Sequence, residues 1–412
     1  MFKNIVTVFA PFTPNMGEQN QIKGLVTWLA RCSRNSKNAK FVTNMELFMQ
    51  NVTGNSLRCS DYASFSDFEK DMFICFDNYF QNRLIKPRLF VTALTQGEKE
   101  QAVYNAEAEC RAVKNYYQQK NWGNIMTVIM TAKYGSYEIA DLVNLPEHQL
   151  SSQEFKQFSE NPNLADKVFF SLGIVHNLTK TFIRQKYGQK CLQKISEKYK
   201  NNKPNAVFCL GGRALGNDII FDIEVAQKIW NKAIEIQNND YNVIIVNGPR
   251  TPNDVTDFLY EKCIENKEID FYNSKKIAEN DEERQPEKWR IYSGKYEEDF
   301  ILQSKKCNNI YPGILGLPNT VAIHTFDSFA ACETASSGVP TAICRYVKIN
   351  AQTRPDCYRL ADSLLNNEYA INLDDFSGEI EPIKLKLKRL PSVSRLFAEK
   401  VIEKYLLFKR NG

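Results

Sequence analysis

Short apolar runs alternate along this chain with longer stretches in which apolar positions recur every three or four residues. The short runs predict strands, and the longer stretches predict amphipathic helices. Predicted strands are Ile5–Ala10, Phe41–Val42, Leu89–Ala93, Ile125–Met130, Ala140–Val143, Val168–Ser171, Ala206–Leu210, Val243–Val246, Trp289–Ile291, Thr320–Ile323 and Thr341–Ile343. Predicted helices are Gln21–Ala30, Gln101–Gln119, Ile223–Gln237, Pro252–Asn266 and Ser328–Ser337. This alternation favours an α/β fold with parallel sheets wound by helices.

The chain of 412 residues is too long for one ordinary domain, so we expect two. A lysine-rich run that ends at Pro204 separates two series of strands. We therefore predict a first domain over 1–200, a second over 201–380, and a tail over 381–412. In the tail, the alternating run Ile383–Leu390 predicts an edge strand protected by lysines, and Val393–Lys409 predicts an amphipathic helix that packs back on the body.

Composition excludes several classes of protein. The net charge of +5 is mild and the charges of both signs are interspersed, which argues against nucleic-acid binding. Eleven scattered cysteines are typical of free thiols in a reducing compartment. No apolar run is long enough for a transmembrane helix. We expect a cytoplasmic protein, with peripheral membrane contact through the basic tail as an alternative.

The strand predicted at Ala206–Leu210 runs directly into Gly211, Gly212 and Arg213. Two glycines let the backbone approach a ligand closely, and the planar guanidinium of an arginine suits a diphosphate. The alternative is a tight turn that carries a surface arginine. The sequence leaves both interpretations open.

The next strand ends in a segment that carries Arg250, Thr251 and Pro252. Threonine is a favourable N-cap and proline suits the first helical position, so Arg250 is predicted to stand beside a helix N-terminus. The alternative is a helix start without a ligand. Ser293-Gly294, with Tyr296 in the next helix, follows a third strand. Because parallel strands end at one edge, several such ends in register favour a phosphate site.

The stretch from Asn319 to Cys344 reads as strand, polar turn, helix and strand, with the helix stopping at Gly338. Asp327 and Ser328 open the predicted helix, whose N-terminus offers free N–H groups to phosphate. Glu333 follows one to two turns into the helix, where its carboxylate can accept hydrogen bonds from sugar hydroxyls. The stretch therefore predicts a pocket for a nucleotide or a nucleotide sugar.

The chain has three histidines, His148, His176 and His324, and all lie near predicted turns or strand ends. A single histidine is more often structural than catalytic, but near neutral pH it can serve as a general base. No metal-binding spacing, serine-hydrolase elbow or P-loop occurs in the sequence. We expect no tightly bound metal or cofactor.

Taken together, these motifs resemble the mitochondrial fission ELM1 family, the former DUF1022 group. The resemblance covers about residues 1–345 and is weak over 44–88. It rests on the order of the following segments: Gly17-Glu18-Gln19-Asn20-Gln21, Gly24-Leu25, Asp141-Leu142-Val143, Pro146-Glu147-His148, Leu172-Gly173 with His176 and Thr179, Gly211-Gly212, Arg250-Thr251-Pro252, Asp327-Ser328 with Glu333, and Gly338-Val339-Pro340.

The resemblance implies a GT-B-like fold, in which two Rossmann-like parallel-sheet domains face an interdomain cleft. It implies a glycosyltransferase that uses UDP- or a similar nucleotide sugar without a metal, with an acceptor that the sequence does not identify. The donor side comprises Gly211, Gly212, Arg213, Arg250, Thr251, Asp327, Ser328 and Glu333, and the acceptor side comprises Gly17, Asn20 and Gln21. Either His148 or His176 is the expected base. The alternatives are a non-catalytic scaffold that recruits a protein partner, as in mitochondrial fission, and a sugar-nucleotide epimerase.

Overall fold

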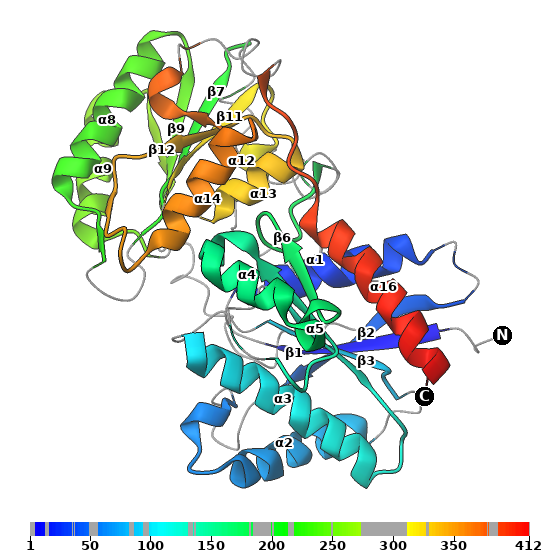
Figure 1. Cartoon of the computed structure of the whole chain (residues 1–412). Coiled ribbons are helices and arrows are strands. Elements are labelled where there is room, and N and C mark those ends of the chain that lie inside the picture. Colours follow the sequence, from blue (N-terminus) through cyan, green and yellow to red (C-terminus); the bar gives the residue numbers. More distant parts are fainter. Residues whose placement is uncertain are drawn as a thin grey trace. The chain divides into compact units, whose positions relative to one another are not determined.

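The structure is a computed structural model. It describes residues 5–12, 16–34, 36, 38–48, 57–81, 86–93, 99–130, 135, 137–180, 183, 199, 202–212, 218–248, 250–272, 311–326, 329–376, 378 and 386–411. The chain divides into two compact units (Figure 1). The N-terminal unit comprises Met1–Asn177 and Ser392–Gly412, and the C-terminal unit comprises Leu178–Pro391.

The N-terminal unit is built on a parallel sheet with the strand order β2-β1-β3-β4-β5-β6. Its strands are β1 (Ile5–Phe12), β2 (Lys40–Phe48), β3 (Leu89–Ala93), β4 (Met126–Met130), β5 (Leu142–Pro146) and β6 (Val168–Ser171). The chain places β2 on one side of β1 and β3 on the other, so the order reverses between β1 and β3. In such sheets, ligands bind at the carboxyl ends of the strands beside this reversal.

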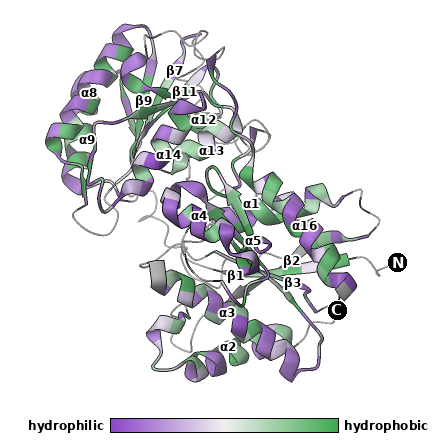
Figure 2. Ribbon diagram, viewed as in Figure 1, coloured by the Kyte–Doolittle hydropathy of each residue, from purple (hydrophilic) through white to green (hydrophobic). Residues whose placement is uncertain are grey.

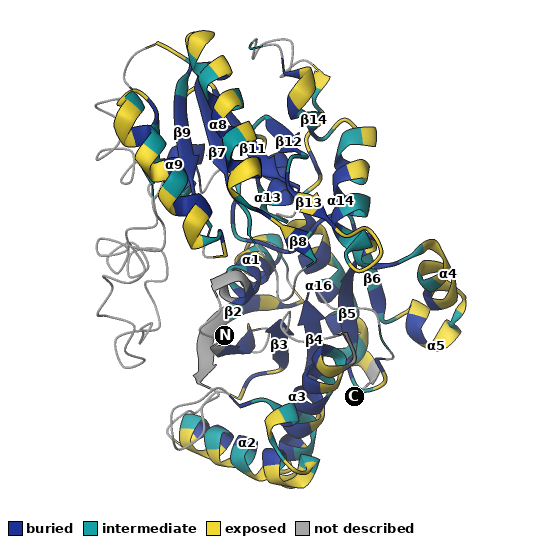
Figure 3. Cartoon of the chain, turned by 90° about the vertical axis from the view of Figure 1, so that its left-hand side faces the viewer, coloured by how far each residue is buried: buried dark blue, intermediate teal, exposed yellow. Residues whose placement is uncertain are grey.

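Helices cover both faces of this sheet. They are α1 (Met16–Cys32), α2 (Phe65–Phe80), α3 (Lys99–Gln119), α4 (Ser152–Glu160), α5 (Pro162–Ala165) and α16 (Val393–Asn411), with short turns η1 (Cys59–Asp61) and η2 (Glu147–Gln149). Neighbouring residues of β1 point to opposite faces: Val8 packs with apolar residues of α1 and α16, and Phe9 with those of α2 and α3. The strands between these two apolar layers are buried (Figure 3).

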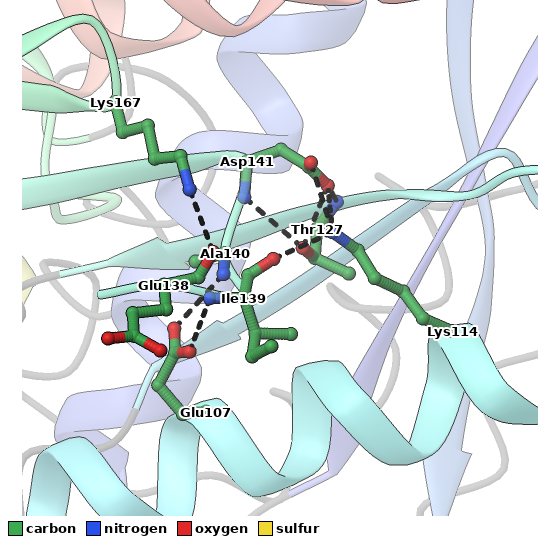
Figure 4. Close-up of polar contacts among 8 residues, drawn as sticks. All are labelled: Glu107, Lys114, Thr127, Glu138, Ile139, Ala140, Asp141 and Lys167. Atoms are coloured by element: carbon green, nitrogen blue, oxygen red, sulfur yellow. Dashed lines mark hydrogen bonds and ion pairs between the residues drawn. The ribbon is translucent and has the colours of Figure 1, made fainter. Parts of the chain in front are cut away.

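A polar network holds the amino ends of β4 and β5 to α3 (Figure 4). The carboxylate of Glu107 accepts the backbone N–H groups of Ile139 and Ala140 at 2.6 and 3.0 Å. Asp141 accepts the N–H and the hydroxyl of Thr127 at 2.8 and 2.9 Å, and it pairs with Lys114. This network lies at the edge opposite the carboxyl ends, so we assign it to stability.

The C-terminal unit repeats the design with a parallel sheet of order β10-β9-β7-β11-β12-β14. Its strands are β7 (Asn205–Cys209), β9 (Asn242–Val246), β10 (Asp270–Tyr272), β11 (Thr320–Thr325), β12 (Thr341–Cys344) and β14 (Ile371–Asn372). An antiparallel pair joins β8 (Ile219–Ile220) to β13 (Lys348–Ile349). Here the order reverses between β7 and β11.

Helices α8 (Ile223–Asn238) and α9 (Asn253–Asn266) lie on one face of this sheet, and α12 (Tyr311–Leu315), α13 (Ala330–Ser337) and α14 (Pro355–Asn366) on the other (Figure 1). A further short turn, η4 (Leu373–Asp375), follows β14. Asp222 caps α8, because its side chain accepts the N–H of Val225 at 3.0 Å. Gly338 ends α13 with a φ of 81°, which suits glycine. Hydrophobic residues of α8 and α9 gather toward the sheet and polar ones away from it (Figure 2).

The predicted fold class of two Rossmann-like parallel-sheet units is confirmed. The sequence predicted a boundary near residue 200, but the units divide after Asn177. The segment after Asn177 belongs to the C-terminal unit because Leu178 and Ile183 pack against Leu315 and Ala322. The tail helix is confirmed as α16. The edge strand predicted over Ile383–Leu390 is wrong for the residues that the structure describes, since 386–390 pair with no strand. The strand predicted over Trp289–Ile291 lies outside the described residues.

Candidate functional site

The carboxyl ends of β7, β9 and β11 are joined by side-chain hydrogen bonds. Thr325, the last residue of β11, accepts the backbone N–H of Gly211 with its hydroxyl at 2.7 Å. The hydroxyl of Thr251 donates to the carbonyl of the same Gly211 at 2.6 Å and accepts the N–H of Gly248 at 2.9 Å. Both polar groups of Gly211 are therefore fixed at the point where the strand order reverses, and this edge is the candidate ligand site.

Gly212 sits where the segments after β7 and β9 approach each other. A Cβ added to Gly212 would lie 2.0 Å from the carbonyl carbon and oxygen of Arg250 and 2.5 Å from the nitrogen of Thr251. A Cβ on Gly248 would lie 2.8 Å from the carbonyl oxygen of Leu210. The requirement for glycine at these positions thus comes from the neighbouring backbone. A role of Gly211 and Gly212 toward a ligand stays a prediction.

The prediction that Thr251 caps helix α9 is wrong. The cap is Pro252 and the helix begins at Asn253, one residue later than predicted. Thr251 is buried, and its hydroxyl joins β9 to β7 instead. Arg250 is exposed beside it and forms no ion pair within the part of the chain that the structure describes.

Glu333 lies in the first turn of α13, the helix after β11, and its side chain is partly exposed. Burial of the carboxyl raises its pKa to about 7. Burial raises the pKa of the Cys209 thiol as well, with the charge of Glu333 as the second cause. Because α13 follows the carboxyl end of β11, the first turn of α13 lies at that edge of the sheet. Glu333 therefore belongs to the same edge as Gly211.

Two further side chains at this edge escaped the sequence analysis. Arg345 directly follows β12, pairs with Asp362 of α14, and stands 6.0 Å from the centre of the Phe326 ring. The sequence feature that could have identified Arg345 is its position shortly after the predicted strand Thr341–Ile343. Thr325 ends β11 and bonds a residue 114 positions away, so only the polar end of that strand marked it.

His324, on β11, is fully buried, and its Nε2 lies 3.1 Å from the hydroxyl of Thr334 on α13. Burial lowers the pKa of its imidazole to about 3, so the ring is neutral at physiological pH. The imidazole of His324 is enclosed between β11 and α13 of the C-terminal unit.

Three residues assigned to the donor side, Arg213, Asp327 and Ser328, lie outside the described residues, as do Ser293-Gly294 and Tyr296.

In the N-terminal unit, the predicted acceptor-side residues occupy the first turns of α1, directly after the carboxyl end of β1. Gly17 and Asn20 lie in the first turns, and Gln21 is buried one turn before Gly24. A Cβ on Gly24 would lie 2.3 Å from the carbonyl oxygen of His176. The structure therefore brings the start of α1 close to one of the two candidate bases.

His148 lies in η2, directly after the carboxyl end of β5, and His176 follows β6. Both are almost completely buried. Burial lowers the pKa of His176 to about 4, which keeps its ring neutral but makes it a weak base. The two histidines share the carboxyl edge of the sheet with α1. Their catalytic role stays a prediction.

A buried carboxyl in the N-terminal unit was not predicted. Glu109 of α3 accepts the hydroxyl of Thr92, on β3, at 2.7 Å, and both side chains are buried. The pKa of Glu109 is raised to about 8, mainly by burial. The hydrogen bond from Thr92 and the charge of Arg58 lower this pKa, and the charge of buried Glu18 of α1 raises it. In the sequence, Glu109 follows Glu107 in a largely polar helix, so it has the pattern of a solvent-exposed residue. The sequence pattern therefore gave no indication that Glu109 is buried.

The described residues also bear on metal binding and on membrane insertion. No group of three or more His, Cys, Asp or Glu side chains is arranged to hold a metal ion within the described ranges. Across those same residues, no helix has the length and apolar character needed to cross a membrane.

No family model and no curated protein matches this chain. Among solved structures, it is similar to UDP-GlcNAc 2-epimerase from Neisseria meningitidis bound to UDP-GlcNAc, with 11% identity, a TM-score of 0.45, and 98% of this chain and 99% of that chain covered. It is also similar to a UDP-glucosyltransferase from Polygonum tinctorium, with 10% identity, a TM-score of 0.46, and coverage of 97% and 98%. The resemblance to the ELM1 family stays a prediction.

Proposed function

We propose that the C-terminal unit binds the nucleoside diphosphate of a nucleotide sugar, and that the chain is a metal-independent glycosyltransferase of GT-B type. The observation that carries the proposal is the linked edge at the reversal between β7 and β11. There, the Thr325 and Thr251 hydroxyls fix the peptide of Gly211, and Glu333 stands in the first turn of the helix that follows β11.

The chemistry of this edge suits a nucleoside diphosphate. Arg250 is an exposed cation directly after β9, and it supplies positive charge for a diphosphate in the absence of a metal. The carboxylate of Glu333, a half-buried residue, accepts hydrogen bonds from the two ribose hydroxyls. Gly211, Gly212 and Thr251 then act as the rigid platform between them, with Arg213, Asp327 and Ser328 completing the donor side.

The carboxyl edge of the N-terminal unit is proposed to face the acceptor. Gly17, Asn20 and Gln21 stand there in the first turns of α1. The base that removes the proton of the acceptor hydroxyl is His148 or His176.

Calorimetry with UDP, GDP, TDP and ADP tests the proposal, and we expect wild-type protein to bind at least one of them. Glu333→Ala is expected to weaken that binding about tenfold to a hundredfold, because hydrogen bonds to a charged acceptor are lost. Since the carboxylate is the accepting form and its pKa is about 7, wild-type affinity should rise between about pH 6 and pH 8. Glu333→Gln should lose that part of the pH dependence.

A matched control is Glu224→Ala, which removes an exposed glutamate of α8 that pairs with Lys228 and Lys348. Its nucleotide affinity should equal that of the wild type. If no nucleotide binds to the wild type, the enzyme proposal fails and a scaffold role is favoured. Incubation with UDP-N-acetylglucosamine, followed by analysis of the sugar, separates transfer from epimerisation.

A further inference from the structure

In the N-terminal unit, the amino ends of the strands form the edge of the sheet opposite the predicted acceptor side. Ile5 begins β1 and pairs with Lys40, which begins β2. Lys86 and Arg88 precede β3, and the backbone N–H of Arg88 donates to the carbonyl of Thr7 on β1 at 3.0 Å. The parallel strands therefore bring positions that are far apart in the sequence to one edge.

Two helices end at the same edge. The ring of Tyr405, near the end of α16, has its centre 5.3 Å from that of Phe41 on β2. The hydroxyl of Ser33, which directly follows α1, accepts the backbone N–H of Phe41 at 3.0 Å. Lys404 of α16 donates to the backbone carbonyl of Asp166, two residues before β6, at 3.0 Å. The last turns of α1 and α16 therefore share a surface with the starts of the strands.

Cations gather on this surface. The following lysine and arginine side chains are exposed and form no ion pair with any residue that the structure describes: Arg31, Arg34, Lys40, Lys86, Arg88, Lys409 and Arg410. We call this set the basic edge. Of the acidic residues beside it, Asp77 pairs with Lys120 and Glu399 with Arg395, and Asp166 is exposed. Charges of both signs alternate along the sequence, but the fold separates them and leaves this edge positive.

Apolar side chains are exposed among these cations. Leu407 lies two residues before Lys409 in the last turns of α16 and is 46% exposed. Ile5, at the start of β1, is 37% exposed. The ammonium of Lys86 stands 4.1 Å from the centre of the ring of half-buried Trp122. Exposed apolar side chains beside lysine, arginine and tryptophan are typical of surfaces that lie at the boundary of a lipid bilayer.

We propose that the basic edge docks onto a membrane surface that contains anionic lipids. The lysine and arginine side chains contact the charged headgroups, and Leu407 and Ile5 enter the boundary between headgroups and acyl chains. A polyanion such as a nucleic acid would engage the cations alone and leave both apolar side chains in water. The apolar residues therefore favour a membrane. Docking of this edge does not depend on the proposed function.

Sedimentation of the full chain with lipid vesicles tests the docking. We expect the wild type to sediment with vesicles of phosphatidylcholine and phosphatidylserine, and to stay in solution with vesicles of phosphatidylcholine alone. Raising the salt concentration should release the protein, because salt screens exposed charges. A wild type that does not bind the phosphatidylserine vesicles overturns the proposal, and equal binding to both kinds of vesicle does so too.

Lys409→Gln combined with Arg410→Gln tests the cations. At about fivefold per charge, loss of both should weaken binding to the phosphatidylserine vesicles about 25-fold. The matched control is Lys228→Gln combined with Lys388→Gln, which removes the same charge from two exposed lysines of the C-terminal unit. The control should bind as the wild type does. An equal loss in both double variants would mean that net charge alone attracts the protein, and it contradicts the basic edge.

Leu407→Gln distinguishes a membrane from a polyanion. It should weaken vesicle binding about fivefold or more, because an apolar side chain no longer enters the bilayer. Leu396→Gln is the matched control, since Leu396 is 43% exposed on the same helix about three turns earlier, and it should bind as the wild type does. Fluorescence anisotropy with duplex DNA completes the test. Wild-type binding to DNA, with vesicle binding unchanged in Leu407→Gln, would assign the basic edge to a polyanion and overturn membrane docking.

Discussion

Gly212→Ala is expected to abolish nucleotide binding and to destabilise the C-terminal unit by about 3 kcal/mol or more. The new Cβ would lie 2.0 Å from the carbonyl of Arg250, and backbone atoms cannot rotate away as a side chain can. The segments after β7 and β9 must then separate, which breaks the hydrogen bond from Thr251 to Gly211. Denaturant unfolding measures the loss of stability, and calorimetry with UDP at low temperature measures binding by the molecules that remain folded.

Gly24→Ala is a matched control for this prediction. Its Cβ would lie 2.3 Å from the carbonyl oxygen of His176, so it introduces a similar backbone overlap in the other unit. We expect comparable destabilisation of the N-terminal unit and wild-type affinity for UDP in the folded fraction. A folded Gly212→Ala protein that binds UDP as tightly as the wild type would remove this edge from the ligand site.

The central strands of both sheets are predictable because their burial on both faces makes them short, continuous apolar runs. Leu89–Ala93, a fully buried central strand, has the same bounds in prediction and structure. Val168–Ser171 also has matching bounds, although it is the edge strand β6 and its two middle residues are half-buried. Strands β8, β13 and β14 contain two residues each, too few for any period to appear. The Ala140–Val143 prediction is displaced because Ala140 and Asp141 belong to the polar network before β5.

The sequence predicts which residues stand at the ends of the strands, but it does not predict which residues they contact. Polar residues after strands correctly mark the carboxyl edge, as at Gly211 and Thr251. The partner of each lies in a distant segment: Thr325 bonds a residue 114 positions away, and Thr251 one 40 positions away. No local pattern encodes such a pairing. The wrong cap assignment for Thr251 has the same cause. A threonine before a helix can cap that helix or bond a distant strand, and the local sequence does not distinguish the two.

Glu109→Gln is expected to change how the stability of the N-terminal unit depends on pH. Burial raises the pKa of Glu109 to about 8 from an ordinary value of 4.5, so the fold favours the protonated carboxyl. This contribution is fully present below about pH 4.5 and is lost as the pH rises toward 8. At about 1.4 kcal/mol per pKa unit, the shift corresponds to about 4 to 5 kcal/mol. The variant should therefore match the wild type near pH 5 and exceed it in stability near pH 8.

The groups around Glu109 decide the size of this effect. The hydroxyl of Thr92 and the charge of Arg58 favour ionisation, whereas buried Glu18 of α1 opposes it. The charge of Glu18 therefore adds to the burial that keeps Glu109 protonated in the folded protein. Urea unfolding at both pH values, with pulsed hydrogen exchange of α3 peptides, isolates the N-terminal unit. Glu224→Gln is the control, since that exposed carboxylate has a lowered pKa and should leave the wild-type slope nearly unchanged. An unaltered slope in Glu109→Gln would show that Glu109 is already ionised in the folded protein at neutral pH.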